Sequence, residues 1–209
     1  MPARVAVFVF AAALLVAGCV SSKSSAPSTT GRTATSKATA SGKTTTNSAP
    51  SALQAEANSA ATGDVPDNQV FIGFRDTAPA YSMKYPEGWA QQGKGARVTF
   101  RDKNNIVRVV VTPGATPTAA SIRADVRRLR GAHVQSGPQL LTISGARAFK
   151  VVYTTASPRN AVTGKRVTLL VDRYYLSRAG KEAIVDLGTP VGVDNVDAYR
   201  LMIESFRWR

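Results

Sequence analysis

The sequence has very few of the side chains on which most catalytic and metal sites depend. It contains one cysteine, Cys19, and one histidine, His133. A lone cysteine cannot form a disulfide within the chain, and one histidine without a second thiol leaves a zinc site short of its usual ligands. No G-x-S-x-G sequence is present, and no glycine-rich phosphate loop leads into a helix. We therefore expect no enzyme activity, no cofactor and no metal site.

The N-terminal 18 residues have the pattern of an export signal. Arg4 precedes the apolar run VAVFVFAAALLVAG, which is too short to cross a hydrocarbon core of ~30 Å as a helix. The run ends directly before Cys19, and LLVAGC resembles a bacterial lipobox, in which the cysteine is acylated and becomes the N-terminus. The resemblance implies a signal peptide over 1–18 and a lipid-anchored protein (palmitate on Cys19) on the extracytoplasmic face of the cell membrane. An ordinary signal peptide with a buried cysteine is the alternative.

Residues 20–62 lack aromatic side chains altogether. Serine, threonine, alanine, glycine and lysine make up most of this segment, which cannot bury enough apolar surface to offset the entropy of folding. We expect residues 19–65 to form a disordered tether behind the lipidated cysteine. Residues 66–209 then form a single domain of ordinary size.

The first part of that domain alternates apolar and polar residues, as strands with one buried face do. Tyr81, Met83 and Tyr85 alternate with Ser82 and Lys84. Strands are predicted over 70–75, 80–86, 96–102, 106–113, 139–144, 146–156, 165–178 and 181–190.

Two segments follow a helical period instead. One lies within 116–133, and the other begins after Asp194, which is a favourable N-cap residue. The order of strands, helix, strands and helix predicts an α+β domain whose antiparallel sheet is flanked by helices. The apolar stripes of the two helices are Ile122, Val126, Leu129 and His133, and Val196, Tyr199, Ile203 and Phe206.

The run YSMKYPEGW, residues 81–89, has two interpretations. In the first, its alternate aromatic residues pack in the core, Pro86 to Gly88 turn the chain, and Trp89 covers the edge of the core. In the second, the aromatic residues form a platform that stacks on a ligand. We favour the first, because the alternation is that of a strand with one buried face.

Three stretches together resemble the PsbP-like superfamily: YSMKYPEGW, the hairpin VTFRDKNNIVRVVVTPG, and DAYRLMIESFRW near the C-terminus. That family includes an extrinsic subunit of photosystem II, nuclear Ran-binding proteins and many bacterial lipoproteins. The resemblance covers about residues 68–209. It implies an α-β-α sandwich around an antiparallel sheet and a non-enzymatic role in binding or assembly.

Carboxylates offer the remaining catalytic and metal-binding alternatives. Asp172 and Asp186 lie on predicted strands and form a candidate pair for a divergent hydrolase, although the adjacent Arg173 suggests ordinary surface pairing. The DNVD sequence at 194–197 has oxygen ligands for a hard cation, but we favour helix capping as its explanation. A small-ligand carrier or sensor is a further alternative, with a pocket between sheet and helices lined by Tyr174 and Tyr175.

The strongest functional signal is positive charge, with a net charge of +14 over the chain. Basic residues gather in the hairpin 96–113 and in the helix within 116–133. They are either solvated charges that keep the domain soluble or a surface for anionic lipid, an acidic wall polymer or an envelope protein. Nucleic acid does not fit the expected compartment. We therefore expect a non-enzymatic binding or scaffolding module whose binding surface comprises Arg97, Arg101, Lys103, Arg108, Arg123, Arg127, Arg128 and Arg130.

Overall fold

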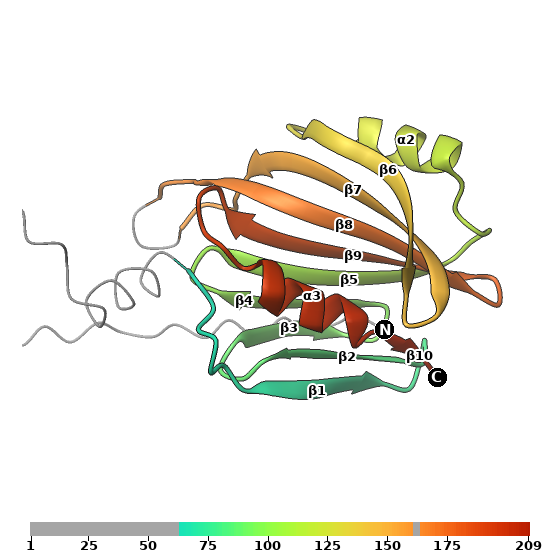
Figure 1. Ribbon diagram of the computed structural model, residues 1–209, viewed down its shortest axis with the longest axis horizontal. Coiled ribbons are helices and arrows are strands. Elements are labelled where there is room, and N and C mark those ends of the chain that lie inside the picture. The colour runs from blue at the N-terminus through green and yellow to red at the C-terminus, as the bar shows by residue number, and fades with distance from the viewer. Residues whose placement is uncertain (1–62, 161–163) are drawn as a thin grey trace, which may run out of the picture. The chain divides into compact units, whose positions relative to one another are not determined.

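The computed structural model describes residues 63–160 and 164–209, which form two antiparallel sheets and two helices (Figure 1). The expected signal peptide, Cys19 and most of the expected tether lie outside the described residues. Neither helix in the described part is long and apolar enough to cross a membrane.

The larger sheet has seven strands in the order β3-β4-β5-β9-β8-β7-β6, and every neighbouring pair is antiparallel. Strands β7 and β9 have the predicted bounds, whereas no strand is predicted at β3. All five residues of β3 are exposed, so no apolar alternation reveals it. The strands are β3 Ala90–Lys94, β4 Arg97–Asp102, β5 Asn105–Pro113, β6 His133–Ile143, β7 Ala146–Ala156, β8 Thr168–Arg178 and β9 Lys181–Pro190.

The smaller sheet has the order β1-β2-β10 and joins the two ends of the domain. Its strands are β1 Phe71–Asp76, β2 Tyr81–Pro86 and β10 Arg207–Trp208. The two helices are α2 Ala119–Arg127 and α3 Val196–Glu204. In Figure 1, α3 lies across the strands and leads directly into β10.

The two helices cover opposite faces of the larger sheet. Tyr174 on β8 shares a buried cluster with Tyr199 of α3, whereas Tyr175, the next residue on the strand, packs with Ile122 of α2. Successive strand residues point to opposite faces. The cluster on the α3 side also contains residues of β1 and β2, so the smaller sheet and α3 together cover that face.

The expected α-β-α sandwich therefore needs correction. The domain is α+β and its sheets are antiparallel, as predicted, but sheet dominates both sides of the core. On the α3 side, a second sheet does much of the covering. On the α2 side, one nine-residue helix packs over β7 and β8 and is too short to cover all seven strands.

Both predicted helices are shorter than their apolar stripes suggest. The first ends at Arg127, the chain turns at Gly131 with a φ of 69°, and His133 begins β6 with an exposed side chain. Val196 was predicted to face the core but is 70% exposed, and Met202 is buried instead. The N-cap of α3 is Asn195 rather than Asp194.

Asn195 provides no capping bond because its side chain is used in a buried polar cluster. Its Nδ2 donates to Thr189 Oγ1 at 2.9 Å and to the Gly63 carbonyl at 3.1 Å. Its Oδ1 accepts from the Val65 backbone N–H at 2.8 Å. Asn105 also donates to the Gly63 carbonyl. These bonds attach residues 63–65, which the sequence assigns to the tether, to the folded part.

The run YSMKYPEGW packs in the core. Tyr81 and Met83 are buried, and Trp89 is 8% exposed. Tyr85 is half-buried and stacks on Phe100 with ring centroids 4.0 Å apart. The Tyr81 hydroxyl donates to the Gly95 carbonyl at 3.2 Å. These contacts leave no open aromatic platform in this run.

Replacing Tyr81 tests this packing. We expect Tyr81→Ala to lower the free energy of unfolding by about 3–5 kcal/mol, because it leaves a large cavity beside Phe74 and Phe206. Tyr81→Phe removes only the hydroxyl bond and should cost about 1 kcal/mol. Urea unfolding measures both, and similar small losses in the two variants would contradict the buried position.

Candidate functional site

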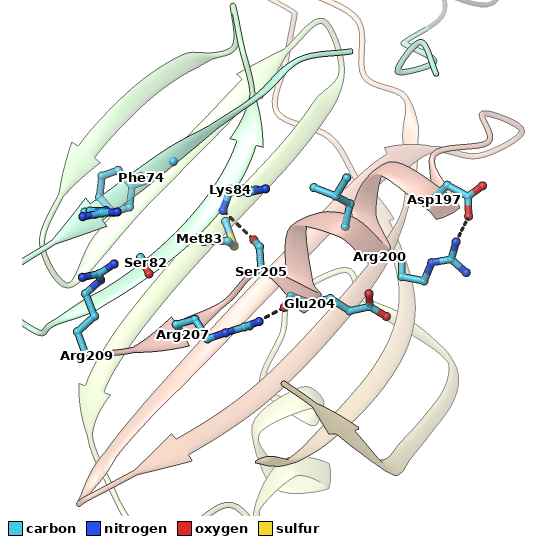
Figure 2. A pocket seen from close by; sticks show the side chains of 13 residues that line it. Phe74, Ser82, Met83, Lys84, Asp197, Arg200, Glu204, Ser205, Arg207 and Arg209 are labelled. Atoms are coloured by element: carbon cyan, nitrogen blue, oxygen red, sulfur yellow. Dashed lines mark hydrogen bonds and ion pairs between the residues drawn. The ribbon is translucent and has the colours of Figure 1, made fainter. Parts of the chain in front are cut away.

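Hollows open beside α3 on the described part of the chain. One has a volume of about 690 Å³ and lies between α3 and the smaller sheet (Figure 2). Another, of about 650 Å³, lies between residues 64–71 and the start of α3. Tyr174 and Tyr175 line neither, because both are buried. The lining that the carrier alternative predicted is therefore wrong, although the first hollow does lie between a sheet and a helix.

The structure places the predicted basic residues of the hairpin on the α2 side of the larger sheet. Thr99 of β4 pairs with Arg108 of β5, and Arg108 pairs with Asp186 of β9. Arg97 and Arg101 lie two residues on either side of Thr99, so they share its face. Both arginines are exposed, and Arg108 keeps 46% of its side chain exposed. Lys103 is exposed in the β4–β5 turn.

The basic residues of the predicted helix lie on the same side. Helix α2 packs on this face through Ile122 and Val126, which are both buried. Arg123 and Arg127 of α2 are exposed, as are Arg128 and Arg130 just after its end. We call the eight predicted residues together the arginine face: Arg97, Arg101, Lys103, Arg108, Arg123, Arg127, Arg128 and Arg130.

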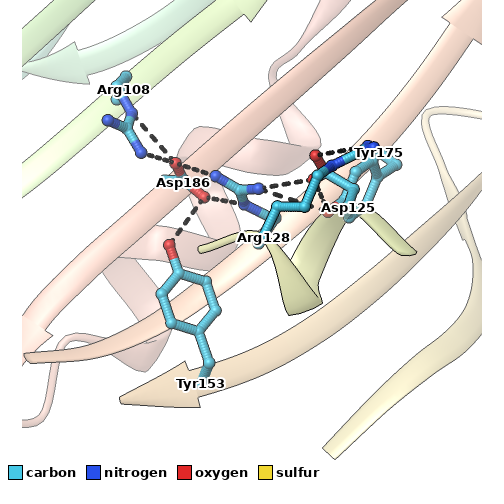
Figure 3. Close-up of polar contacts among 7 residues, drawn as sticks. Arg108, Asp125, Arg128, Tyr153, Tyr175 and Asp186 are labelled. Atoms are coloured by element: carbon cyan, nitrogen blue, oxygen red, sulfur yellow. Dashed lines mark hydrogen bonds and ion pairs between the residues drawn. The ribbon is translucent and has the colours of Figure 1, made fainter. Parts of the chain in front are cut away.

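A chain of alternating charges connects the two halves of the arginine face (Figure 3). From the hairpin, Arg108 Nη2 lies 2.6 Å from Asp186 Oδ2. Asp186 Oδ1 accepts from Arg173 Nε at 2.7 Å, and Arg173 Nη1 donates to Asp125 Oδ2 of α2 at 2.9 Å. The other oxygen of Asp125 lies 3.8 Å from Arg128.

The centre of this chain is out of contact with water. Arg173 is 5% exposed and Asp186 is 4% exposed. Their two hydrogen bonds, at 2.7 and 3.1 Å, are bidentate. Sequence reasoning expected surface pairing for Arg173, and this expectation is wrong. The sequence could not reveal this burial, because an Arg and an Asp on adjacent strands follow the same sequence pattern whether the pair is buried or exposed.

Two tyrosine hydroxyls complete the network. Tyr175 donates to Asp125 Oδ2 at 2.7 Å, and Tyr153 donates to Asp186 Oδ1 at 3.4 Å. Burial raises the pKa of Tyr153 to about 12, with Asp186 adding to the rise, and burial also raises the pKa of Tyr175. Both hydroxyls therefore keep their protons at physiological pH.

Arg173 remains charged despite its burial. Desolvation alone lowers the pKa of its guanidinium, but the hydrogen bonds and charge of Asp186 outweigh that effect and leave the pKa above its ordinary value. Near neutral pH, Arg173 is therefore a fixed positive charge within the network. The network holds the neighbouring cations, Arg108 and Arg128, through their contacts with Asp186 and Asp125.

The predicted carboxylate pair does not form. Asp186 pairs with Arg173 across β8 and β9, so Asp172, the neighbour of Arg173, points to the opposite face of the sheet. There Asp172 lies 2.6 Å from Lys150 Nζ. Two carboxylates separated by the sheet cannot act on one bond, which removes this pair as a hydrolase site.

The two aspartates of the DNVD sequence bond to residues close to them in the sequence. Asp194 Oδ1 accepts from the Val196 backbone N–H at 3.2 Å, and Asp197 lies 2.8 Å from Arg200. Among residues 63–160 and 164–209, no three His, Cys, Asp or Glu side chains gather as a metal-ligand set.

No protein-family model and no curated protein matches this sequence. Some solved structures are similar to it. Cyanobacterial PsbP from Synechocystis sp. PCC 6803 is 17% identical with a TM-score of 0.46, over 70% of this chain and 98% of that chain. The Ran-binding protein Mog1p of Saccharomyces cerevisiae is 10% identical with a TM-score of 0.42, over 68% and 96%.

Two further neighbours are bacterial. LpqN, described as involved in cell envelope biogenesis of Mycobacterium tuberculosis, is 12% identical with a TM-score of 0.39, over 67% of this chain and 91% of that chain. A protein from Bacteroides thetaiotaomicron is 15% identical with a TM-score of 0.44, over 66% of this chain. The match spans about half of that protein, 48% of its length.

Removing one partner of the buried pair tests the network. Asp186→Ala removes the bidentate partner of the buried Arg173 and leaves the partly exposed Asp125 as its remaining counter-charge, so we expect the free energy of unfolding to fall by about 3–5 kcal/mol. Asp172→Ala is the matched control, since it breaks a half-exposed pair on the other face and should cost about 1 kcal/mol or less. Denaturant titration compares them, and equal losses would contradict the role assigned to Asp186.

Proposed function

We propose that this protein is a lipid-anchored binding module of the cell envelope, which uses its arginine face to hold an anionic surface and performs no catalysis. The observation that carries the proposal is that the basic residues of β4 and β5 lie on the face of the larger sheet that α2 covers, with further exposed cations on α2, just after it and in the β4–β5 turn. The partner is anionic lipid or an acidic wall polymer. The lipid on Cys19 would hold the domain at the extracytoplasmic face of the membrane.

The acidic residues within the arginine face do not cancel its charge. Asp186 is shared between Arg108 and Arg173, and Asp125 is shared between Arg173 and Arg128. Each carboxylate therefore neutralises part of two cations. The remaining positive charge attracts an anionic partner, and salt should weaken that attraction.

The spread of exposed cations over the face also favours a partner that covers a wide area, such as a membrane or a polymer. Helix α2 packs over β7 and β8, while Arg97, Arg101 and Arg108 remain exposed on the strands beside it. Exposed arginines on a sheet surface can contact several headgroups or polymer phosphates at once. Each cation near an anionic membrane contributes about 1 kcal/mol to the binding free energy, so the contacts add up in small, similar amounts.

The lipid anchor is tested by Cys19→Ser. We expect the wild-type chain to sediment with membranes after a high-salt wash, because acyl chains hold it independently of charge, and the variant to appear in the soluble fraction. Ser22→Ala, a nearby change that spares the cysteine, should behave as wild type. A wild-type chain washed off by salt, with an unmodified Cys19 by mass spectrometry, would contradict the anchor.

The arginine face is tested with the full chain carrying Cys19→Ser, so that no acyl chain contributes. We expect Arg97→Gln/Arg101→Gln to weaken binding to vesicles of phosphatidylcholine and phosphatidylglycerol by about 30-fold, from the loss of ~1 kcal/mol for each cation. Vesicle co-sedimentation at low salt measures the affinity.

The charge-matched control is Arg178→Gln/Lys181→Gln, which removes two exposed cations at the β8–β9 turn. It should bind nearly as wild type. Equal weakening by the two double variants would show that net charge alone drives binding. Unchanged vesicle binding together with lost binding to isolated wall polymer would identify the polymer as the partner.

A further inference from the structure

A second group of cations lies in the larger hollow, away from the arginine face. The floor of this groove is the outward side of β1 and β2, and one wall is α3 (Figure 2). Tyr81 and Met83 of β2 point into the core, so Ser82 and Lys84 between and beyond them point into the groove. The cations that line it are Arg75, Lys84, Arg200, Arg207 and Arg209.

The strand register places two of these arginines on either side of one hydroxyl. Arg75 of β1 and Arg207 of β10 both pair with Ser82 of β2. The three residues therefore lie in one row across the smaller sheet, with adjacent strands about 4.8 Å apart. Lys84 follows Ser82 on the same face, and Arg209 also lines the groove. Four cationic residues thus line the same groove as Ser82.

Carboxylates compensate little of this charge. Asp197 pairs with Arg200 at 2.8 Å, which leaves Glu204 as the other acidic side chain in the groove. Among the ion pairs of the described residues, none involves Arg75, Lys84, Arg207 or Arg209. Like charges that converge without counter-charges repel one another, and a bound anion relieves that repulsion.

The groove is partly prearranged for an anion. Arg207 Nη1 donates to the Glu204 carbonyl at 2.6 Å and to the Phe206 carbonyl at 2.7 Å, and it also bonds Ser144 Oγ. These bonds fix the guanidinium at the edge of the groove before any ligand arrives, which lowers the entropy cost of binding. Gly73 keeps the floor open, since no heavy atom lies within 4 Å of the position a Cβ would take.

We propose that this groove binds a phosphoryl group. A phosphoryl group presents several charged oxygens at once, which suits convergent guanidinium and ammonium donors and a hydroxyl. Leu201 of α3, 40% exposed, lines the same groove and gives an apolar contact for the carbon portion of a phosphoester. The site is separate from the arginine face, and the inference does not depend on the proposed function.

The test uses the full chain with Cys19→Ser, labelled with ¹⁵N and titrated with glycerol 3-phosphate at constant ionic strength set with sodium chloride. We expect saturable shifts of the Gly73 and Ser82 backbone amide signals. Arg75→Gln should weaken the affinity about tenfold, since it removes one charge-assisted contact. The control Arg147→Gln removes an exposed cation outside the groove and should leave the affinity unchanged.

A second experiment, with phosphatidylglycerol vesicles, distinguishes a lipid headgroup from a free phosphorylated solute as the source of the phosphoryl group. Vesicle binding that falls in Arg75→Gln indicates a lipid headgroup, whereas glycerol 3-phosphate binding with vesicle binding unaffected indicates a free phosphorylated solute. Both support the site. Absent shifts, or equal weakening by Arg75→Gln and Arg147→Gln, would overturn it. Vesicle binding that depends on Arg97 and Arg101 but occurs without groove shifts would overturn this inference and retain the proposed function.

Discussion

The buried pair of Arg173 and Asp186 is the interaction on which the α2 side of the domain depends. Each charge would be costly to bury alone, and each is acceptable here because it pairs with the other and has further hydrogen-bond partners, Tyr153 for Asp186 and Asp125 for Arg173. Asp186 binds Arg108 of β5, and Arg173 binds Asp125 of α2. The pair therefore connects the helix to the middle of the sheet through directional bonds, which an apolar contact of the same size would not provide.

This arrangement explains how a strongly basic surface coexists with a stable fold. The chain has 27 basic and 13 acidic side chains, so most cations cannot find a carboxylate. In the network, each of two aspartates is shared by two arginines, which spreads scarce negative charge over the places where cations meet. Elsewhere, as with Arg97, cations are left in water, where their repulsion is screened. The fold tolerates the excess of positive charge, and the excess is available to a partner.

The sequence predicted those strands and hairpins that are determined by apolar alternation and by turn residues. The hairpin of β4 and β5 and the strands β7 and β9 follow from period-two patterns. That the eight basic residues of two separate segments form one binding surface stays a prediction. The sequence could not predict contacts between distant residues. The groove depends on β10 pairing with β2, a partner more than a hundred residues away, so Arg75, Ser82 and Arg207 show no shared signal in the sequence. The helix stops before His133 because the chain turns at Gly131, and the spacing of apolar residues carries no information about this turn.

The layers of the domain constrain how its two cationic surfaces can be used. The arginine face lies on the α2 side of the larger sheet, whereas the smaller sheet and α3 cover the other side. The groove opens on the outward side of that second layer. A flat membrane in contact with the arginine face therefore cannot also reach the groove. If both surfaces bind at once, the groove must take a soluble ligand or a flexible polymer, and the protein would link that ligand to the anionic surface.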